Sequence, residues 1–176
     1  MKVSKSCMCL LLFSILLSFS CQAQQKDSLL VQLSRKWSDS KAYAFKIASL
    51  MPEEDYGFKP VLEEMSFREQ LLHIADNIRW LSSDYLLSQP AKRMTETTQP
   101  DKKTVLKILS DAYDTGMQAH QKLLPSQLEE RVSFFAGPMS RRQILILLHD
   151  HQSHHLGQLI VYLRLKGIKP PEYVGW

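Results

Sequence analysis

The sequence predicts an all-α fold, a four-helix bundle in one domain that follows an amino-terminal signal segment. Apolar residues recur with the 3.6-residue period of an α-helix in four segments, no segment shows the convincing alternation of a strand, and proline-containing stretches separate the segments. A chain of 176 residues is long enough for one such domain but not for two ordinary ones. We therefore expect a signal peptide over residues 1–23 and one helical domain over residues 24–176.

The composition excludes several classes of protein. Hydrophobic residues make up 44% of the chain and charged residues 23%, and low-complexity tracts are absent, which argues against a disordered or fibrous protein. The formal net charge of +4 is mild, and neither a basic run nor an RNA-binding aromatic motif accompanies it. We therefore exclude nucleic acid as a partner.

The beginning of the chain has the order of a secretory signal. Lys2 and Lys5 precede an apolar stretch over residues 8–19, and small residues follow. Cleavage after Ala23 would leave Gln24 as the first residue of the mature chain. We therefore expect an exported protein, periplasmic or extracytoplasmic.

Two alternatives to cleavage after Ala23 stay open. Cys21 could be the lipidated residue of a lipoprotein, and only in that case would we expect attachment to a membrane. The segment could also stay as an uncleaved anchor, although its apolar run is shorter than the ~20 residues that a membrane-spanning helix needs.

The cysteines restrict the chemistry of the mature chain. All three of them, Cys7, Cys9 and Cys21, lie in the signal segment or at its edge, so cleavage after Ala23 removes them. The mature domain would then have no disulfide and no thiolate, and a metal site would have to use His, Asp or Glu.

The first two helices are delimited by a proline and a capping motif. The first is expected over residues 28–50 and ends before Pro52. The second is expected to begin at Ser66, because Ser66 and Glu69 have the spacing of a capping box, and its apolar stripe continues to Tyr85.

The third helix is expected from Asp101 to a point near Pro125, and it is the least sharply bounded of the four. The connections over residues 52–65 and 124–139 are longer than the short turns that force neighbouring helices to be antiparallel. Loop length alone therefore does not determine the order of the helices in the bundle.

The fourth helix is expected to begin with a second capping box, formed by Ser140 and Gln143, after the Gly-Pro pair at 137–138. It continues to Gly167, because glycine readily adopts the positive φ of a helix end. Such a helix would span roughly 40 Å.

The histidines are the candidates for chemistry, and four of the six lie within seven residues of the fourth helix. They are His73, His120, His149, His151, His154 and His155. His151 and His155 continue the inward stripe that includes Ile144 and Leu148, and residues four apart lie one helical turn apart on the same side. Two unpaired imidazoles facing a core are costly to desolvate, and a shared divalent ion would satisfy both. The alternative is that each is a hydrogen-bonded core histidine or faces a wet end of the bundle.

A third metal ligand is expected from another helix. His73, near the apolar stripe of the second helix, is the first candidate, and His120, near the end of the third helix, is its competitor. His149 and His154 lie off the expected inward face, where solvated or supporting imidazoles are the simpler interpretation.

These residues carry a resemblance to the DinB-like family of metal-binding four-helix bundles. It rests on His73 after Met65-Ser66-Phe67-Arg68-Glu69, on His151-x-x-His154-His155-x-Gly157-Gln158, on Tyr162-Leu163-Arg164-x-x-Gly167-x-x-Pro170-Pro171 and on Tyr56-x-x-Lys59-Pro60. The resemblance implies a long crossover between the second and third helices, and a divalent metal, zinc or alternatively nickel, held by His73, His151 and His155. The family often has Arg where this chain has Leu156, which puts polar contacts near the ligands in doubt.

The expected function follows from this resemblance. Three neutral imidazoles would leave the ion open positions and lower the pKa of a bound water toward ~7, as in catalytic sites. We expect a metal-dependent hydrolase or a thiol or small-molecule transferase, and export favours the hydrolase. Asp76, Asn77 and Gln158 are candidate proton shuttles or, alternatively, surface and packing residues. The catalytic residues and the substrate, expected to be a small molecule, are not identified, and a homodimer stays open.

The competing function is a non-catalytic module that keeps the metal for stability or for binding a small ligand. A structural site should have a fourth protein ligand, and His120 or His154 would supply it. Trp37 and Trp80 could line a pocket, but helical aromatic residues more often belong to a core.

Overall fold

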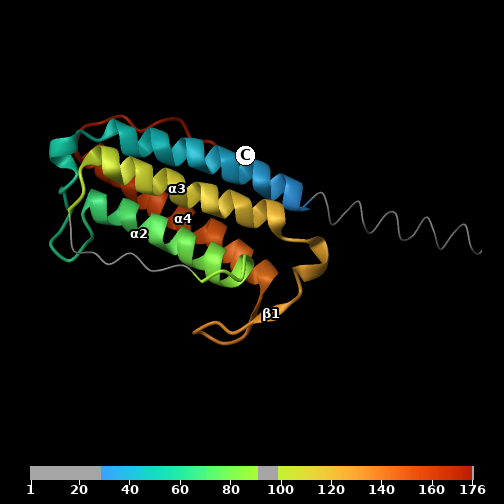
Figure 1. The fold of residues 1–176 in the computed structure, drawn as a ribbon. Helices are drawn as coiled ribbons and strands as arrows, with labels where there is room; N and C mark the ends of the chain where they lie inside the picture. Colours follow the sequence, from blue (N-terminus) through green and yellow to red (C-terminus); the bar gives the residue numbers. More distant parts are fainter. Residues whose placement is uncertain (1–28, 91–98, 176) are drawn as a thin grey trace, which may run out of the picture.

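The computed structural model describes residues 29–90 and 99–175, so the predicted signal peptide and its cleavage site lie outside the described residues. Four long helices form a bundle (Figure 1). They are the first helix over residues 29–50, α2 (Phe67–Trp80), α3 (Lys102–Lys122) and α4 (Arg141–Leu165). The expected all-α four-helix bundle is confirmed. None of the described helices is both long enough and apolar enough to cross a membrane.

The helix starts have the chemistry that the sequence predicts. The Ser66 amide donates to Glu69 Oε2 at 2.6 Å and the Glu69 amide donates to Ser66 Oγ at 3.2 Å, which closes the capping box of α2. Ser140 and Gln143 form the same reciprocal pair at the start of α4. Asp101 caps α3 by accepting from the Thr104 amide at 2.8 Å. These side chains satisfy amide groups that would otherwise lack partners.

The ends of two helices show how the chain is connected. Gly167 has φ +72°, in agreement with its predicted place at the end of α4. The Lys102 ammonium group donates to the carbonyl groups of Ser49 and Met51, so the beginning of α3 lies against the end of the first helix. Figure 1 shows α2 and α3 running in the same direction, as a crossover connection between them requires.

Five short elements were not predicted. The second helix leaves α geometry after Trp80 and continues as the π-helical segment η2 (Leu81–Leu86). β1 (Arg131–Val132) and β2 (Met139–Ser140) form an antiparallel hairpin before α4. Two residues per strand are too few for an alternating pattern to be visible in a sequence. Two 3-10 turns, η1 (Glu53–Asp55) and η3 (Pro125–Gln127), lie in the long connections.

Trp37 occupies the centre of the core rather than a pocket. Its side chain is fully buried, and its indole nitrogen donates to the Tyr113 carbonyl on α3 at 2.9 Å. Gly116 lies directly beneath the indole ring, because a Cβ atom at this position would overlap it. Trp80, by contrast, is only partly buried and stacks on Phe134 of the hairpin segment, with ring centroids 5.6 Å apart.

Replacing Gly116 by alanine tests this close approach. Overpacking against a fully buried indole typically costs about 1–3 kcal/mol, which exceeds the roughly 1 kcal/mol that alanine gains over glycine in a helix. We therefore expect Gly116→Ala to lower the free energy of unfolding, measured by denaturant titration. Gly157→Ala in α4 is the matched control, because its Cβ would meet nothing within 4 Å, and it should leave stability unchanged or raised. Equal stability changes for the two variants would contradict the packing described here.

Candidate metal centre

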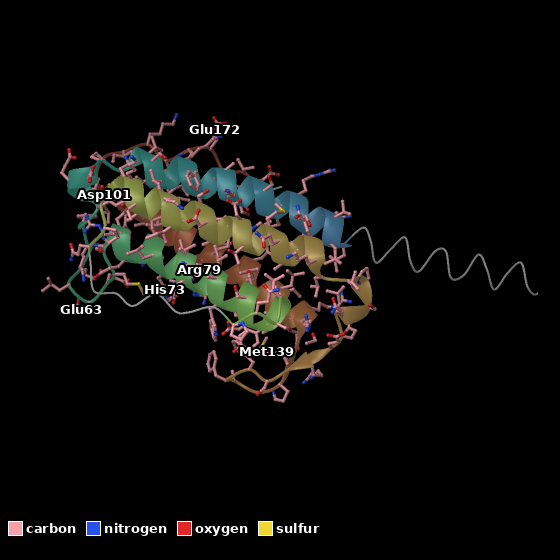
Figure 2. The ribbon with its side chains drawn as sticks, in the orientation of Figure 1. Glu63, His73, Arg79, Asp101, Met139 and Glu172 are labelled. Carbon is pink, nitrogen blue, oxygen red and sulfur yellow. The ribbon has the colours of Figure 1, made fainter. Side chains whose placement is uncertain are left out.

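Three histidines from two helices gather on the interface between α2 and α4. His73 belongs to α2 (Figure 2), and His151 and His155 lie one turn apart on α4. Their ring centroids are 4.6 Å apart for His73 and His155, 4.9 Å for His73 and His151, and 4.5 Å for His151 and His155. One ligand nitrogen from each residue lies within 4.8 Å of the other two. The histidine triad expected from the sequence is therefore assembled in the fold.

The arrangement suits a divalent ion. The Nε2 atoms of His73 and His151 are 3.1 Å apart. Two imidazoles that bind one ion at ~2.0–2.1 Å place their nitrogens roughly 3 Å apart, so this pair needs little movement. His151 Nδ1 is buried without a hydrogen-bond partner, which shows that hydrogen bonding alone leaves this ring incompletely satisfied.

Burial keeps the imidazole rings of His151 and His155 neutral. Burial, followed by the proximity of His155 and His73, lowers the pKa of His151 to about 4. Burial, followed by the proximity of His73 and His154, lowers the pKa of His155 to about 4. Both rings are therefore neutral near pH 7, which is the state in which an imidazole offers a lone pair to a metal.

Gln70 is the residue of the site that sequence reasoning missed. It lies on α2, one turn before His73, and is only 1% exposed. Its Oε1 atom lies 2.6 Å from His155 Nδ1, and its Nε2 atom donates to Gln158 Oε1 at 2.8 Å. The signal in the sequence was its place one turn before His73, whereas its burial and its partners on α4 depend on the packing of helices far apart in the sequence.

The position of His149 corrects the sequence interpretation, which placed this residue off the inward face. His149 is only 5% exposed, and its Nε2 atom lies 2.8 Å from Nε2 of His120, which is 2% exposed. Trp37 stacks on the His120 ring with centroids 5.0 Å apart and meets the His149 ring edge-on at 5.2 Å. The reason is that α4 packs on more than one neighbour, so a single inward stripe underestimates its buried surface.

The contact with His149 also argues against His120 as a metal ligand, the role that the sequence left open for it. His120 Nδ1 donates to the Gly116 carbonyl at 2.7 Å, and its Nε2 atom is engaged with His149. Burial lowers the pKa of His120, so this ring is neutral near pH 7. Within residues 29–90 and 99–175, no fourth His, Cys, Asp or Glu joins the group formed by His73, His151 and His155.

The surroundings of the other polar candidates near the ligands differ. Gln158 accepts from Gln70 and donates through Nε2 to His154 Nε2 at 3.2 Å, so its amide is held in a side-chain network. His154 itself is exposed and outside the triad. Asn77 Oδ1 is buried without a hydrogen-bond partner. Asp76 is partly buried, and its proposed role stays a prediction.

Two arginines at the start of α4 and the carboxyl-terminal segment have partners within the chain. Arg142 pairs with Glu129 at 2.6 Å, and the Arg141 Nε lies 3.1 Å from Glu130, so these arginines form ion pairs within the chain. The carboxyl-terminal segment folds back along the first helix (Figure 1). The rings of Tyr43 and Tyr173 lie 6.0 Å apart.

Comparison with known proteins identifies the class to which this bundle and its histidine triad belong. A sequence profile described as the DinB family matches residues 22–175. Because this match covers most of the sequence, the chain belongs to the DinB family.

Individual relatives agree with this assignment. The uncharacterized protein YjoA of Bacillus subtilis is 25% identical over 126 residues, which are 69% of this chain and 80% of YjoA. YrdA of the same organism is 31% identical over 77 residues, which are 41% of this chain and 46% of YrdA.

Solved structures show the same fold. The crystal structure of the DinB-like protein YjoA superposes with a TM-score of 0.68 at 20% identity, over 81% of this chain and 96% of the other. A DinB-like protein from Bacillus cereus gives a TM-score of 0.70 at 21% identity, over 81% and 95% of the two chains.

The buried histidines predict how the metal-free protein responds to acid. In the folded chain the pKa of His149 is lowered to about 3 and that of His151 and His155 to about 4, mainly by burial. In the unfolded chain these histidines take up protons near pH 6.5. Their contribution to the free energy of unfolding is therefore fully present above about pH 6.5 and is lost as the pH falls toward 4. The free energy of unfolding should drop by a few kcal/mol, as an order of magnitude, between pH 7.5 and 5.

Denaturant titrations in the presence of a chelator measure this change. The double variant His151→Ala/His155→Ala is the control, because it keeps only the contributions of the buried His120 and His149 and should show a weaker pH dependence. A free energy of unfolding that is equal at both pH values would show that these rings are not buried in their neutral form.

Proposed function

We propose that this protein is an exported, metal-dependent enzyme in which His73, His151 and His155 hold one divalent ion, with zinc as the first candidate and nickel as the alternative. The observation that carries the proposal is the convergence of three imidazoles from two helices, with ligand atoms within 4.8 Å of one another. Imidazole is a ligand that suits both metals.

The number of ligands supports a catalytic rather than a structural site. Structural zinc sites are closed by four protein ligands, whereas catalytic sites use three and keep a position open. His120, one of the two residues proposed as a fourth ligand, is engaged with His149, and His154 contacts Gln158. When bound, such an ion supplies Lewis acidity and lowers the pKa of water at its open position to about 7.

Hydrolysis is the reaction class that we favour for a small-molecule substrate. Transfer of a thiol or another small group is the second reaction that this type of site supports. The signal sequence favours hydrolysis, because low-molecular-weight thiols are abundant in the cytosol and are not expected outside the membrane. The proton shuttle, for which Asp76 and Asn77 stay candidates, would lie within one helical turn of His73.

One observation favours the competing proposal of a non-catalytic binding module. Leu156 follows the last ligand directly and is only 4% exposed, so its side chain packs in the core. A position that is often Arg in similar sequences therefore offers no polar contact to a substrate. The module would then retain the ion for stability or for capture of a small ligand.

Metal analysis of the purified mature chain tests the site. We expect about one divalent ion per chain in the wild type and a large loss of bound metal in His73→Ala, His151→Ala and His155→Ala. His154→Ala is the matched control, since it removes an exposed neighbour of His155 on the same helix and should keep its metal. Equal metal content in His151→Ala and wild type would refute the site.

A panel of ester, amide and electrophile substrates then separates the two functions, because metal without turnover favours the binding module.

The amino terminus of the exported chain tests its processing. Cleavage after Ala23 predicts a mature chain that begins at Gln24, measured by intact-mass spectrometry of protein recovered from outside the cytoplasm. A diacylglycerol adduct on Cys21 would replace this proposal by the lipoprotein alternative. An unprocessed Met1 terminus would contradict both.

A further inference from the structure

We propose that Gln70 and Tyr162 form a positioning relay that fixes the tautomer of His155, so that its Nε2 lone pair is directed to the metal site before any ion is bound. This inference rests on the proposed function for its purpose, but the tautomer itself is a property of the metal-free chain. The relay crosses the interface between α2 and α4 twice, because Gln70 belongs to α2 and Tyr162 and His155 belong to α4.

The relay begins at a group whose hydrogen-bonding role cannot change. Tyr162 Oη lies 2.7 Å from the backbone carbonyl oxygen of Met65. A carbonyl oxygen only accepts, so the single hydroxyl proton of Tyr162 is donated to it. The Tyr162 oxygen therefore presents a lone pair, not a proton, to any other neighbour.

The second step fixes the orientation of the Gln70 amide. Gln70 Nε2 lies 3.5 Å from Tyr162 Oη and 2.8 Å from Gln158 Oε1, so both of its protons face acceptors. Gln158 Nε2 also contacts the exposed His154 Nε2 at 3.2 Å, but a ring nitrogen can donate or accept, so the Tyr162 oxygen is the fixed acceptor of the two. Rotation of the Gln70 amide by half a turn would place its oxygen against two oxygen atoms, which is unfavourable in a buried site.

The third step transfers this orientation to the metal ligand. With its Nε2 committed, Gln70 presents Oε1 to His155 Nδ1 at 2.6 Å. Because Oε1 only accepts, Nδ1 must carry the proton, and a neutral imidazole with a proton on Nδ1 has its lone pair on Nε2. Gln70 is 1% exposed, so water does not readily replace this contact. Metal-binding histidines in proteins are commonly oriented through their second nitrogen in this way.

The experiment reads the tautomer directly. Long-range proton–nitrogen correlation NMR of the metal-free, ¹⁵N-histidine-labelled protein should show His155 protonated on Nδ1 in the wild type. Gln70→Leu should give a mixture of tautomers or protonation on Nε2, and its zinc affinity, measured by chelator competition, should fall about 10- to 100-fold. Tyr162→Phe, which keeps the ring and removes the hydroxyl, should weaken binding to a lesser degree. Gln70→Glu keeps an acceptor beside Nδ1 and should keep the proton on Nδ1, while its second oxygen faces the Gln158 and Tyr162 oxygens and should lower stability.

Gln152→Leu is the matched control. Gln152 is also a glutamine with 1% exposure, and it accepts from the Tyr113 hydroxyl at 2.7 Å instead of touching the triad. Its replacement should lower stability without changing the His155 tautomer or zinc affinity, which separates positioning from general destabilisation. Protonation of wild-type His155 on Nε2, or an unchanged tautomer in Gln70→Leu, would overturn the relay. Absence of zinc binding by the wild type would instead overturn the proposed function, while the NMR result would still decide the relay.

Discussion

The antiparallel packing of α2 against α4 is the constraint on which the candidate site depends. The hydrogen bond between Gln70 and Gln158 fixes the register of the two helices, and Tyr162 extends the same register to Met65 at the beginning of α2. In this register His73 lies opposite the turn that carries His151 and His155. A shift by one residue would rotate these rings away from one another, since successive helical residues differ by about 100°.

The same interface requires the imidazoles to be neutral. Desolvation opposes charge on His151 and His155 in the absence of a counter-charge, and it thereby prepares the lone pairs that a cation needs. The folded chain therefore accepts unfavourable burial of polar rings at a place where a metal ion would compensate for it. Elsewhere in the bundle, burial is mostly apolar and needs no such compensation.

The sequence predicted the fold well because its signals are local. The capping boxes at Ser66 and Ser140 depend only on residues three apart, and Gly167 terminates α4 through its own backbone freedom. The triad was accessible for a similar reason, since the i, i+4 spacing places His151 and His155 on one face. The contacts of Gln70 and the burial of His149 were not, because they depend on how helices far apart in the sequence are oriented about their axes.

Histidines of α4 take part in two clusters, the pair with His120 and the triad with His73, and the comparison shows why composition alone does not define a metal site. In the pair formed by His120 and His149, each Nε2 atom faces the other, the Gly116 carbonyl holds the second nitrogen of His120, and Trp37 covers the rings. Three of the four ring nitrogens of this pair therefore have a hydrogen-bond partner within the protein, and the buried Nδ1 of His149 has none. At His155 the hydrogen bond to Gln70 has the opposite consequence, because it occupies Nδ1 and leaves the Nε2 lone pair available to an ion. The partner across the interface, rather than the number of histidines, determines which group is suited to hold an ion.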